Sequence, residues 1–519
     1  MDRVPHRPLR VLIVRAASDP IADWQAMLLD RLSVDPLVTL VGMVAGQGAC
    51  TARPGGALLG GILSIERRLV AGQLRCYDTS GARAILARLS QRGTLQDSDS
   101  ADLAIVLGAR DLSDDQLHLA HHGSWSVRFA GAASAVWPAA TVTQRASPRM
   151  PVEILSRTVH APGYALVRTA SYNLKPGAVL TGAFVEEKSV LLILRALHDL
   201  ATGQLCAPPL ADMIPAPVQP TLLEALGYAV AFAKAAAVKL HHRMRARRGK
   251  GRLFWRLAAG AGPVTDLDLA ASAILPAHNH TMADPFLFEH DGTSWVFYEA
   301  MNADDGAGWI EAARLTEEGL GAPITALTCP YHLSFPFVFR DGDEIFMMPE
   351  TQQSRRLEVW RATDFPTGWT LHATAFEGMY LADSILWHAE DGQWWLLTNL
   401  SDHFAFQDHS SELYLFSVDG PSLTGLKPHP RNPVVIGAEH ARNAGAPILQ
   451  NGRLFRPSQN NSYGVYGYGL NLMEITRLDD KSFEEVLLRR WTPDDLPGSR
   501  GIHHLSVLND RYVFDWSGS

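Results

Sequence analysis

The sequence has few cysteines and no long apolar run. Its four cysteines, Cys50, Cys76, Cys206 and Cys329, lie far apart without a CxxC spacing. This argues against a disulfide framework or a structural zinc site and fits a reducing compartment. No stretch offers about 20 uninterrupted apolar residues, so no membrane-spanning helix is expected. The early apolar run at residues 11–14 is too short for a signal-peptide core, which makes a cytoplasmic location the expectation.

The sequence also lacks a strong charge excess and a phosphate-binding fingerprint. Only 19% of the 519 residues are charged and the net charge is −8, which argues against nucleic acid as a partner. The first predicted strand is followed by Arg15-Ala-Ala-Ser rather than a glycine-rich loop. A standard dinucleotide site is therefore not expected, and no cofactor is predicted.

In the first part of the chain, apolar runs alternate with stretches of helical spacing. The predicted strands cover residues 9–14, 37–44 and 101–107, and the predicted helices cover residues 23–32 and 189–200. Strands that alternate with helices are typical of a parallel sheet. We therefore predict a Rossmann-like α/β domain over residues 8–205.

The middle part, residues 206–265, is predicted to be a linker and a basic helix. A proline-rich stretch at residues 208–220 precedes a helical pattern at residues 222–244. Residues 239–256 contain eight arginines and lysines and no acid. Two interpretations stay open: a solvated connecting helix, or contact with a membrane surface or an anionic glycolipid.

The third part repeats one unit five times, each a strand, a tight turn and a second strand. The units are Asp284-Pro-Phe-Leu-Phe288 with Trp295-Val-Phe-Tyr298, Phe335-Pro-Phe-Val-Phe339 with Ile345-Phe-Met-Met348, Asp383-Ser-Ile-Leu-Trp387 with Trp394-Trp-Leu-Leu397, Gly445-Ala-Pro-Ile-Leu449 with Leu454-Phe455, and His504-Leu-Ser-Val-Leu508 with Tyr512-Val-Phe514. The turns begin at residues 291, 341, 391, 451 and 509 and use Asp-Gly, Asn-Gly or Asn-Asp, which suit hairpin turns. A period of about 50 to 60 residues is the length of one four-stranded blade. The prediction is a five-bladed β-propeller over residues 266–519.

The innermost strand of each blade lines the central channel of a propeller, so residues that open these strands should meet at one mouth. Asp284 and Asp383 hold this position, and Glu299, Glu350 and Asp515 lie at or just beyond second strands. Cleavage of a glycosidic bond needs two carboxyl groups, one as acid and one as base or nucleophile. The alternative is that these acids cap turns or neutralise arginines.

Other polar residues of the repeats are candidates for sugar binding. They are His332, Arg442, Arg456, Gln459, Tyr463, His503 and His504, together with Glu299 and Asp515. Because adjacent strand residues point to opposite faces, only one of His503 and His504 is expected to line the channel. The histidines lack the tight spacing of metal ligands, so no metal site is predicted.

Residues 280–515 resemble the N-terminal domain of glucosamine inositolphosphorylceramide transferases and their bacterial relatives, and through them the five-bladed propellers of glycoside hydrolase family 43. The matching pieces are Ala283-Asp-Pro-Phe286, His332-Leu-Ser-Phe-Pro-Phe337, Met348-Pro-Glu350, Phe365-Pro-x-x-Trp369, Asp391-Gly-x-Trp-Trp395, His429-Pro-x-Asn-Pro433, Arg456-Pro-x-Gln459 and Tyr463-Gly464. The resemblance implies Asp284 as general base, Asp383 as an orienting carboxylate and Glu350 as acid.

The sequence departs from these relatives in two motifs and one domain. Gly308-Trp309-Ile310 stands where relatives have Gly-Glu-Ile, and Asp383-Ser384 where they have Asp-Pro. The separate glycosyltransferase domain of the plant enzymes has no counterpart before Ser519. The transferase activity of that domain is therefore not implied.

The first domain is similar, more faintly, to the formyltransferase-like domain that precedes this propeller in bacterial proteins. Ser126 and Arg128 occupy the positions of the Asn-x-His motif of formyltransferases, and His121 and His122 lie too early to replace it. Formyl transfer needs that histidine for proton handling. The resemblance therefore implies a domain that has lost formyl transfer.

Three functions follow as hypotheses. The first is a carbohydrate-active enzyme that hydrolyses or transfers glycosyl units with Asp284, Glu350 and Asp383. The second is a non-catalytic glycan-binding or scaffold protein of polysaccharide or glycolipid assembly. The third is an amino-sugar formyl or acyl transferase, against which Arg128 argues.

Overall fold

The computed structural model describes residues 7–16, 19–47, 56–91, 100–108, 110–205, 222–246, 254–276, 280–302 and 307–518. The chain forms two compact units, Met1–Val238 with His403–Phe406, and Lys239–Asp402 with Gln407–Ser519. The first unit is an α/β structure and the second is all-β, so this part of the fold prediction is confirmed. The predicted linker at residues 208–220 lies outside the described residues.

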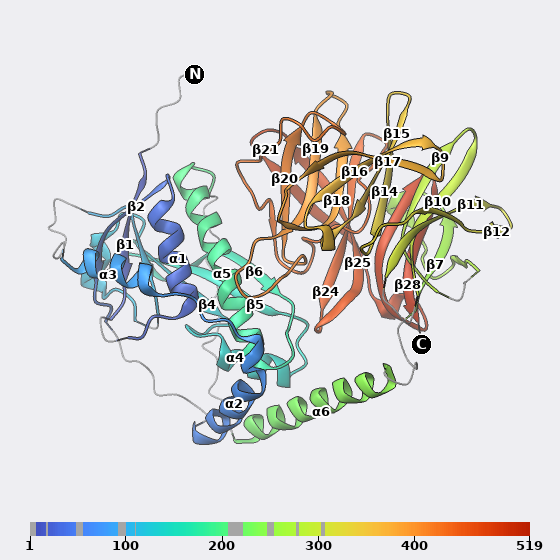
Figure 1. The fold of residues 1–519 in the computed structure, drawn as a ribbon. Coiled ribbons are helices and arrows are strands. Elements are labelled where there is room, and N and C mark those ends of the chain that lie inside the picture. The colour runs from blue at the N-terminus through green and yellow to red at the C-terminus, as the bar shows by residue number, and fades with distance from the viewer. Residues whose placement is uncertain are drawn as a thin grey trace. The chain divides into compact units, whose positions relative to one another are not determined.

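The first unit is built on one six-stranded sheet of order β2-β1-β3-β4-β5-β6 (Figure 1). Its strands are β1 (Leu9–Val14), β2 (Val38–Val44), β3 (Leu103–Val106), β4 (Ser124–Phe129), β5 (Met150–Thr158) and β6 (Ala161–Tyr172). The first four are parallel, and β5 and β6 run antiparallel. The apolar runs predicted as strands are buried here because a parallel sheet is covered on both faces.

Within the described residues, six α-helices accompany this sheet. They are α1 (Asp23–Val34), α2 (Gly56–Val70), α3 (Ser80–Gln91), α4 (Val136–Gln144), α5 (Ala178–Ala201) and α6 (Leu222–Ala246). Trp24 of α1 meets Phe129 of β4, and Phe184 of α5 meets Tyr172 of β6, with ring centroids 5.9 and 6.2 Å apart. The helix predicted at residues 189–200 is the second half of the longer α5. Among the described residues, no helix is long and apolar enough to cross a membrane.

Five antiparallel sheets form the blades of the second unit, drawn from green to red in Figure 1. Blade one contains β9 (Thr281–His290), β10 (Thr293–Met301), β11 (Gly308–Thr316), β12 (Gly319–Leu320) and β13 (Ile324–Leu327); blade two contains β14 (Ser334–Asp341), β15 (Glu344–Glu350), β16 (Leu357–Asp364) and β17 (Gly368–Ala375). Blade three contains β18 (Tyr380–His388), β19 (Trp394–Ser401), β20 (Glu412–Val418), β21 (Lys427–Pro428) and β22 (Val435–Ile436); blade four contains β23 (Ile448–Gln450), β24 (Arg453–Ser462), β25 (Val465–Leu478) and β26 (Phe483–Trp491). Blade five contains β27 (Ser499–Leu508), β28 (Arg511–Gly518), β7 (Phe254–Ala261) and β8 (Ala273–Ile274). The five-bladed propeller is therefore confirmed.

Blade five closes the ring with strands from both ends of the unit. β28 pairs antiparallel with β7, from Arg511 opposite Ala261 to Gly518 opposite Phe254. β7 precedes residue 266, where we expected the propeller to begin, and falls in the segment 206–265 assigned to the linker and helix. The repeat does not reveal β7, because its antiparallel partner next in sequence, β8, has only two residues and is not joined to it by a tight turn. The all-β structure begins at Phe254.

The predicted hairpin turns explain how the first two strands of each blade are joined. Both central residues have positive φ at Asn451 (53°) and Gly452 (72°), and the same holds at Asp291-Gly292 and Asn509-Asp510. Such turns match the right-handed twist of the strands that they join. At the other two turns, positive φ is confined to Gly342 and Gly392.

Candidate functional site

The innermost strands of the first three blades share a bulge at the position where the repeat begins. Asp284, Phe335 and Asp383 have φ values of 50°, 46° and 48°, in the left-handed region that non-glycine residues rarely adopt. The pairing of each strand with its neighbour shifts at the same point. A bulge redirects a side chain relative to regular alternation. The same local device therefore positions Asp284 and Asp383 on two different blades.

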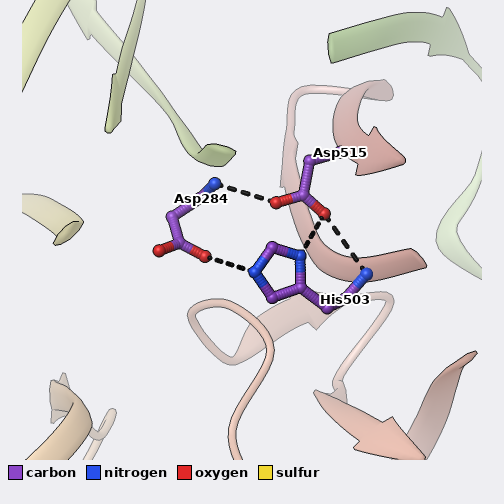
Figure 2. Close-up of side chains that lie close together, drawn as sticks. All are labelled: Asp284, His503 and Asp515. Carbon is purple, nitrogen blue, oxygen red and sulfur yellow. Dashed lines mark hydrogen bonds and ion pairs between the residues drawn. The ribbon is translucent and has the colours of Figure 1, made fainter. Parts of the chain in front are cut away.

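Asp284 is buried and linked to blade five. Its backbone N–H donates to Asp515 Oδ2 at 2.9 Å, and its Oδ1 lies 3.3 Å from Nε2 of His503 (Figure 2). The N–H of Phe335 donates to its Oδ2 at 3.1 Å. The carboxylate is thus fixed from two neighbouring blades.

His503 and His504 both face Asp284, so the prediction that only one would line the channel was wrong. Nδ1 of His504 lies 3.6 Å from Asp284 Oδ1, close to the distance for His503. The pairing of β27 with β28 shifts between Ile502 and Leu505, which interrupts the alternation of side chains. Asp515 Oδ1 stabilises this bulge by accepting the backbone N–H groups of both histidines at 3.2 and 2.9 Å.

Asp383 lies in a buried ion pair with Arg442 of blade four. Arg442 donates from Nε to Oδ2 at 2.5 Å and from Nη2 to Oδ1 at 3.2 Å. Gln459 Nε2 donates to the same Oδ2 at 3.3 Å. Glu350 joins this group: its Oε2 accepts the backbone N–H of Asp383 at 3.3 Å and lies 4.0 Å from Arg442 Nη2. Blades two, three and four therefore meet at this point.

Glu299 and His332 form a further pair. Nε2 of His332 lies 3.4 Å from Glu299 Oε1, and its Nδ1 accepts the N–H of Gly308 at 2.9 Å. The proton of a neutral His332 therefore lies on Nε2 and points at Glu299. Gly308 opens the Gly-Trp-Ile stretch that replaces the Gly-Glu-Ile expected of relatives.

Within the described part of the chain, Arg442 and His503 are the cations paired with Asp383, Asp284 and Asp515 of the five carboxyl groups. Burial raises the pKa of Glu299 well above the ordinary value, and the charge of Asp284 raises it further. Burial does the same to the pKa of Glu350, and the charge of Asp383 adds to it. Burial also raises the pKa of Asp284 to about 7, against the opposing effect of His503. Five buried negative charges would repel one another, so some of these groups keep their protons at neutral pH.

Asp515 and His503 form a second ionised pair of the cluster, beside that of Asp383 and Arg442. Burial raises the pKa of Asp515, but the charge and hydrogen bond of His503 outweigh it and lower the pKa. Burial lowers the pKa of His503, but Asp515 raises it above the ordinary value. Nδ1 of His503 and Oδ1 of Asp515 are 2.8 Å apart. The imidazolium therefore lies between two carboxylates.

Asp284, His503 and Asp515 are also placed as a metal site would require. Each offers one ligand atom, and these atoms lie within 4.8 Å of one another. A metal-binding histidine must be neutral, whereas the surroundings of His503 favour its charged form. Hydrogen bonds already occupy both oxygens of Asp515. Metal binding here would therefore have to displace the proton of His503 and its hydrogen bond to Asp515.

Two predicted sugar-binding residues lie elsewhere. Arg456 is fully buried inside blade four, where Glu485 accepts two hydrogen bonds from its guanidinium at 2.7 and 2.8 Å. Tyr463 is an exposed residue at the β24–β25 turn, and its ring contacts Tyr468. Arg456 is therefore structural, and no described contact joins Tyr463 to the carboxylates.

Sequence reasoning missed two aromatic residues beside the cluster. The ring of Tyr466 lies 4.9 Å from the guanidinium of Arg442 and 5.3 Å from the ring of His503. Trp255 packs on the other side of His503 at 4.1 Å. Tyr466 follows the Tyr463-Gly464 motif by two residues, which was a usable signal. Trp255 lies in β7, outside the repeat, and gave none.

Aromatic side chains pack against one another next to the cluster. The rings of Phe286 and Phe335 are 4.9 Å apart, and the ring of His504 lies 4.5 and 5.1 Å from them. Burial among these groups lowers the pKa of His504 to about 3.

The fold and the site define a class: a five-bladed β-propeller with a buried carboxylate cluster beside an arginine and a histidine. Residues 254–496 match the family model described as glucosamine inositolphosphorylceramide transferase 1, N-terminal. The resemblance expected for this part of the chain is confirmed. The matched segment begins at the first residue of β7.

Curated relatives match over the same half of the chain. Glucosamine inositolphosphorylceramide transferase 1 of Arabidopsis thaliana is 34% identical over 244 residues, which cover 45% of this chain and 31% of the relative. The protein of the same name in Oryza sativa subsp. japonica is 33% identical over 209 residues, 40% of this chain and 27% of the relative. The chain therefore spans about a third of the length of these relatives.

A solved structure with a similar fold is a family 43 glycoside hydrolase described as a β-1,3-galactosidase with galactodeoxynojirimycin. It is 11% identical, covers 50% of this chain and 94% of its own, and gives a TM-score of 0.34. With so low an identity and TM-score, this likeness supports no statement about activity.

Proposed function

We propose that the propeller is a carbohydrate-active domain that cleaves or transfers a glycosyl unit in polysaccharide or glycolipid metabolism. The observation that carries this proposal is the junction of three blades, where Glu350 meets the backbone of Asp383 and Asp284 lies within electrostatic range of both. The relatives named for glucosamine transfer to an inositolphosphorylceramide support a sugar or glycolipid as substrate.

The surroundings of each carboxyl group suggest its role in the reaction. Glu350, whose pKa is raised by burial and by Asp383, would hold a proton at neutral pH and donate it to the leaving oxygen. Asp284, with a pKa of about 7 beside His503, would act as the base or nucleophile. Asp383, held by Arg442, would orient the sugar. Two carboxyl groups whose pKa values are pushed apart are what glycosidic chemistry requires.

Gln459 would add selectivity for a hydroxyl group. Its Nε2 is committed to Asp383, while its buried Oε1 accepts no hydrogen bond from the described residues. A buried acceptor of this kind favours a ligand that brings a donor. A sugar hydroxyl beside Asp383 meets that need.

Turnover of para-nitrophenyl glycosides, glucosaminides included, tests the assignment. Glu350→Gln should lower kcat/KM by about 10²–10⁴-fold, and Asp284→Asn should do the same. The loss in Glu350→Gln should be smaller for a nitrophenyl than for an alkyl leaving group, since nitrophenolate needs little protonation. Glu344→Gln, an exposed carboxylate on the same strand, is the matched control. Equal activity in all three variants would refute the proposal.

A second candidate is glycan binding without turnover. The observation that favours it is the close packing of the rings of Phe286, Phe335 and His504 beside the carboxylates. Calorimetry with oligosaccharides decides between the two. Binding that survives in Glu350→Gln, with no product from the native protein, would select this candidate.

For the first unit we propose a cytoplasmic, formyltransferase-like domain without formyl transfer. Ser126 and Arg128 lie on β4. On the proposed likeness to formyltransferases, they stand where the Asn-x-His motif would be. A guanidinium keeps its proton at neutral pH and is a poor general base. Transfer from a formyl-folate to a nucleotide amino sugar would overturn this proposal and revive the formyltransferase hypothesis.

A further inference from the structure

Helix α6 is fixed to the first unit through its N-terminal turns. Ala225 and Tyr228 are each only 1% exposed. Tyr228 donates its hydroxyl to Glu66 Oε2 of α2 at 2.5 Å and accepts the N–H of Ala178 in α5 at 2.8 Å. One face of α6 is therefore anchored on α2 and α5.

The opposite side of α6 exposes large apolar residues. Leu222, Leu223, Leu226 and Val230 are 70%, 79%, 53% and 69% exposed. Leu222, Leu226 and Val230 are spaced four residues apart, which places them along one side of the helix. A soluble helix normally turns such a stripe toward a core.

Helix α2 shows the same feature. Ile65 and Leu69, four residues apart, are 60% and 68% exposed, and Leu58 is also exposed. Glu66, on the buried side of α2, is the residue that holds Tyr228 of α6. We call the exposed apolar residues of these two helices the α2/α6 surface: Leu58, Ile65, Leu69, Leu222, Leu223, Leu226 and Val230.

The sequence around this surface is basic. Arg67 and Arg68 are exposed on α2. Residues 239–256 carry eight arginines and lysines and no acid, and Lys239, Arg243 and Arg245 of this group belong to α6. Exposed apolar side chains beside an acid-free basic stretch are typical of helices that lie in a membrane interface. A purely apolar protein partner would not explain the charge.

We propose that the α2/α6 surface docks the protein on an anionic lipid bilayer. Its apolar side chains enter the boundary between headgroups and acyl chains, and the exposed Arg67 and Arg68 of α2 meet the lipid phosphates. The proposal concerns peripheral attachment and does not depend on the activity of the propeller.

Flotation of the full chain with lipid vesicles tests the proposal. We expect binding to phosphatidylcholine vesicles with about 30 mol% phosphatidylglycerol, and binding at least about tenfold weaker to phosphatidylcholine alone. Salt at about 0.5 M should weaken the binding, because it screens the charges. The triple variant Leu223→Glu, Leu226→Glu and Val230→Glu should lower the bound fraction at least about tenfold.

The matched control replaces three exposed apolar residues of the propeller, Val486, Leu487 and Leu488 on β26, by glutamate; they are 49%, 47% and 42% exposed. It should bind vesicles within about twofold of the native chain. Circular dichroism and thermal unfolding verify that both variants fold. Equal losses in the two variants, or no flotation of the native chain, would overturn the proposal. A native dimer that becomes monomeric in the α6 variant would assign the surface to a second copy instead.

Discussion

At the scale of single residues, the contrast between two arginine–carboxylate pairs is informative. Arg442 and Asp383 are both buried, whereas Arg453 makes a similar two-bonded pair with Glu474 at the surface. A buried pair adds little net stability, because both charges lose their hydration, but removal of one partner leaves the other charge unpaired. Arg442 therefore compensates the charge of the buried Asp383 and holds its carboxylate in one orientation.

Arg442→Met should therefore lower the free energy of unfolding by about 3 kcal/mol or more, because it strands Asp383 in the protein interior. Arg453→Met, the surface control, should change stability little. Urea unfolding measures both. If Arg442→Met unfolds at the same urea concentration as Arg453→Met, the pair is more hydrated than its burial indicates.

Asp284 should make stability depend on pH. Its pKa of about 7 in the folded protein exceeds the ordinary value of about 3.9, so its contribution is full below pH about 4 and is lost as the pH rises through about 7. Between pH 5 and pH 8, the free energy of unfolding of the native chain should fall by about 1–3 kcal/mol relative to that of Asp284→Asn. Asp291→Asn, at an exposed hairpin turn, provides the baseline for urea titrations. A parallel pH response in the two variants would contradict the assignment.

At the scale of elements, the bulge that opens the inner strands is the feature that builds the site. In blade four its position is held by Gly445, with φ of 138°. A Cβ there would lie 2.0 Å from the carbonyl oxygen of Leu505, whose own N–H donates to Ala444 at 2.7 Å. Blades four and five therefore meet through backbone at a position without room for a side chain.

Gly445→Ala should be strongly destabilising, by about 3 kcal/mol or more, because both the backbone conformation and the contact with blade five must change. Gly452→Ala also has positive φ, but no atom lies within 4 Å of the new carbon. Gly452→Ala should therefore lower the free energy of unfolding by only about 1 kcal/mol. Thermal unfolding of the two variants compares them, and similar losses would show that crowding is not the cause.

The repeat predicted the elements well and the site in part. Asp284 and Asp383 could be found because they occupy equivalent positions in two repeats. The sequence could not predict that both His503 and His504 approach Asp284. A bulge between Ile502 and Leu505 breaks the alternation of side chains on which strand predictions depend. Arg456 looked like a binding residue because a sequence does not reveal that Glu485, two strands away on β26, neutralises it.

At the scale of the whole molecule, the second unit depends on β7. Without this strand the outer edge of β28 is unpaired, and the cluster loses Trp255. A polypeptide of residues 254–519 should therefore fold cooperatively, whereas one of residues 266–519 should be aggregated or melt at a much lower temperature. Calorimetry and size-exclusion chromatography compare the two. Equal stability would show that β7 is dispensable.

Because β7 pairs with β28, the ring cannot close until β28 has been synthesised. β7 leaves the ribosome roughly 250 residues before its partner β28. At about 5–20 residues per second, it waits on the order of 10–50 s with an open edge. The four complete blades that emerge in between cannot close the ring on their own. The nascent chain is therefore exposed to misassociation until its last strand is made, and co-translational chaperones should matter more for this half of the protein than for the α/β unit.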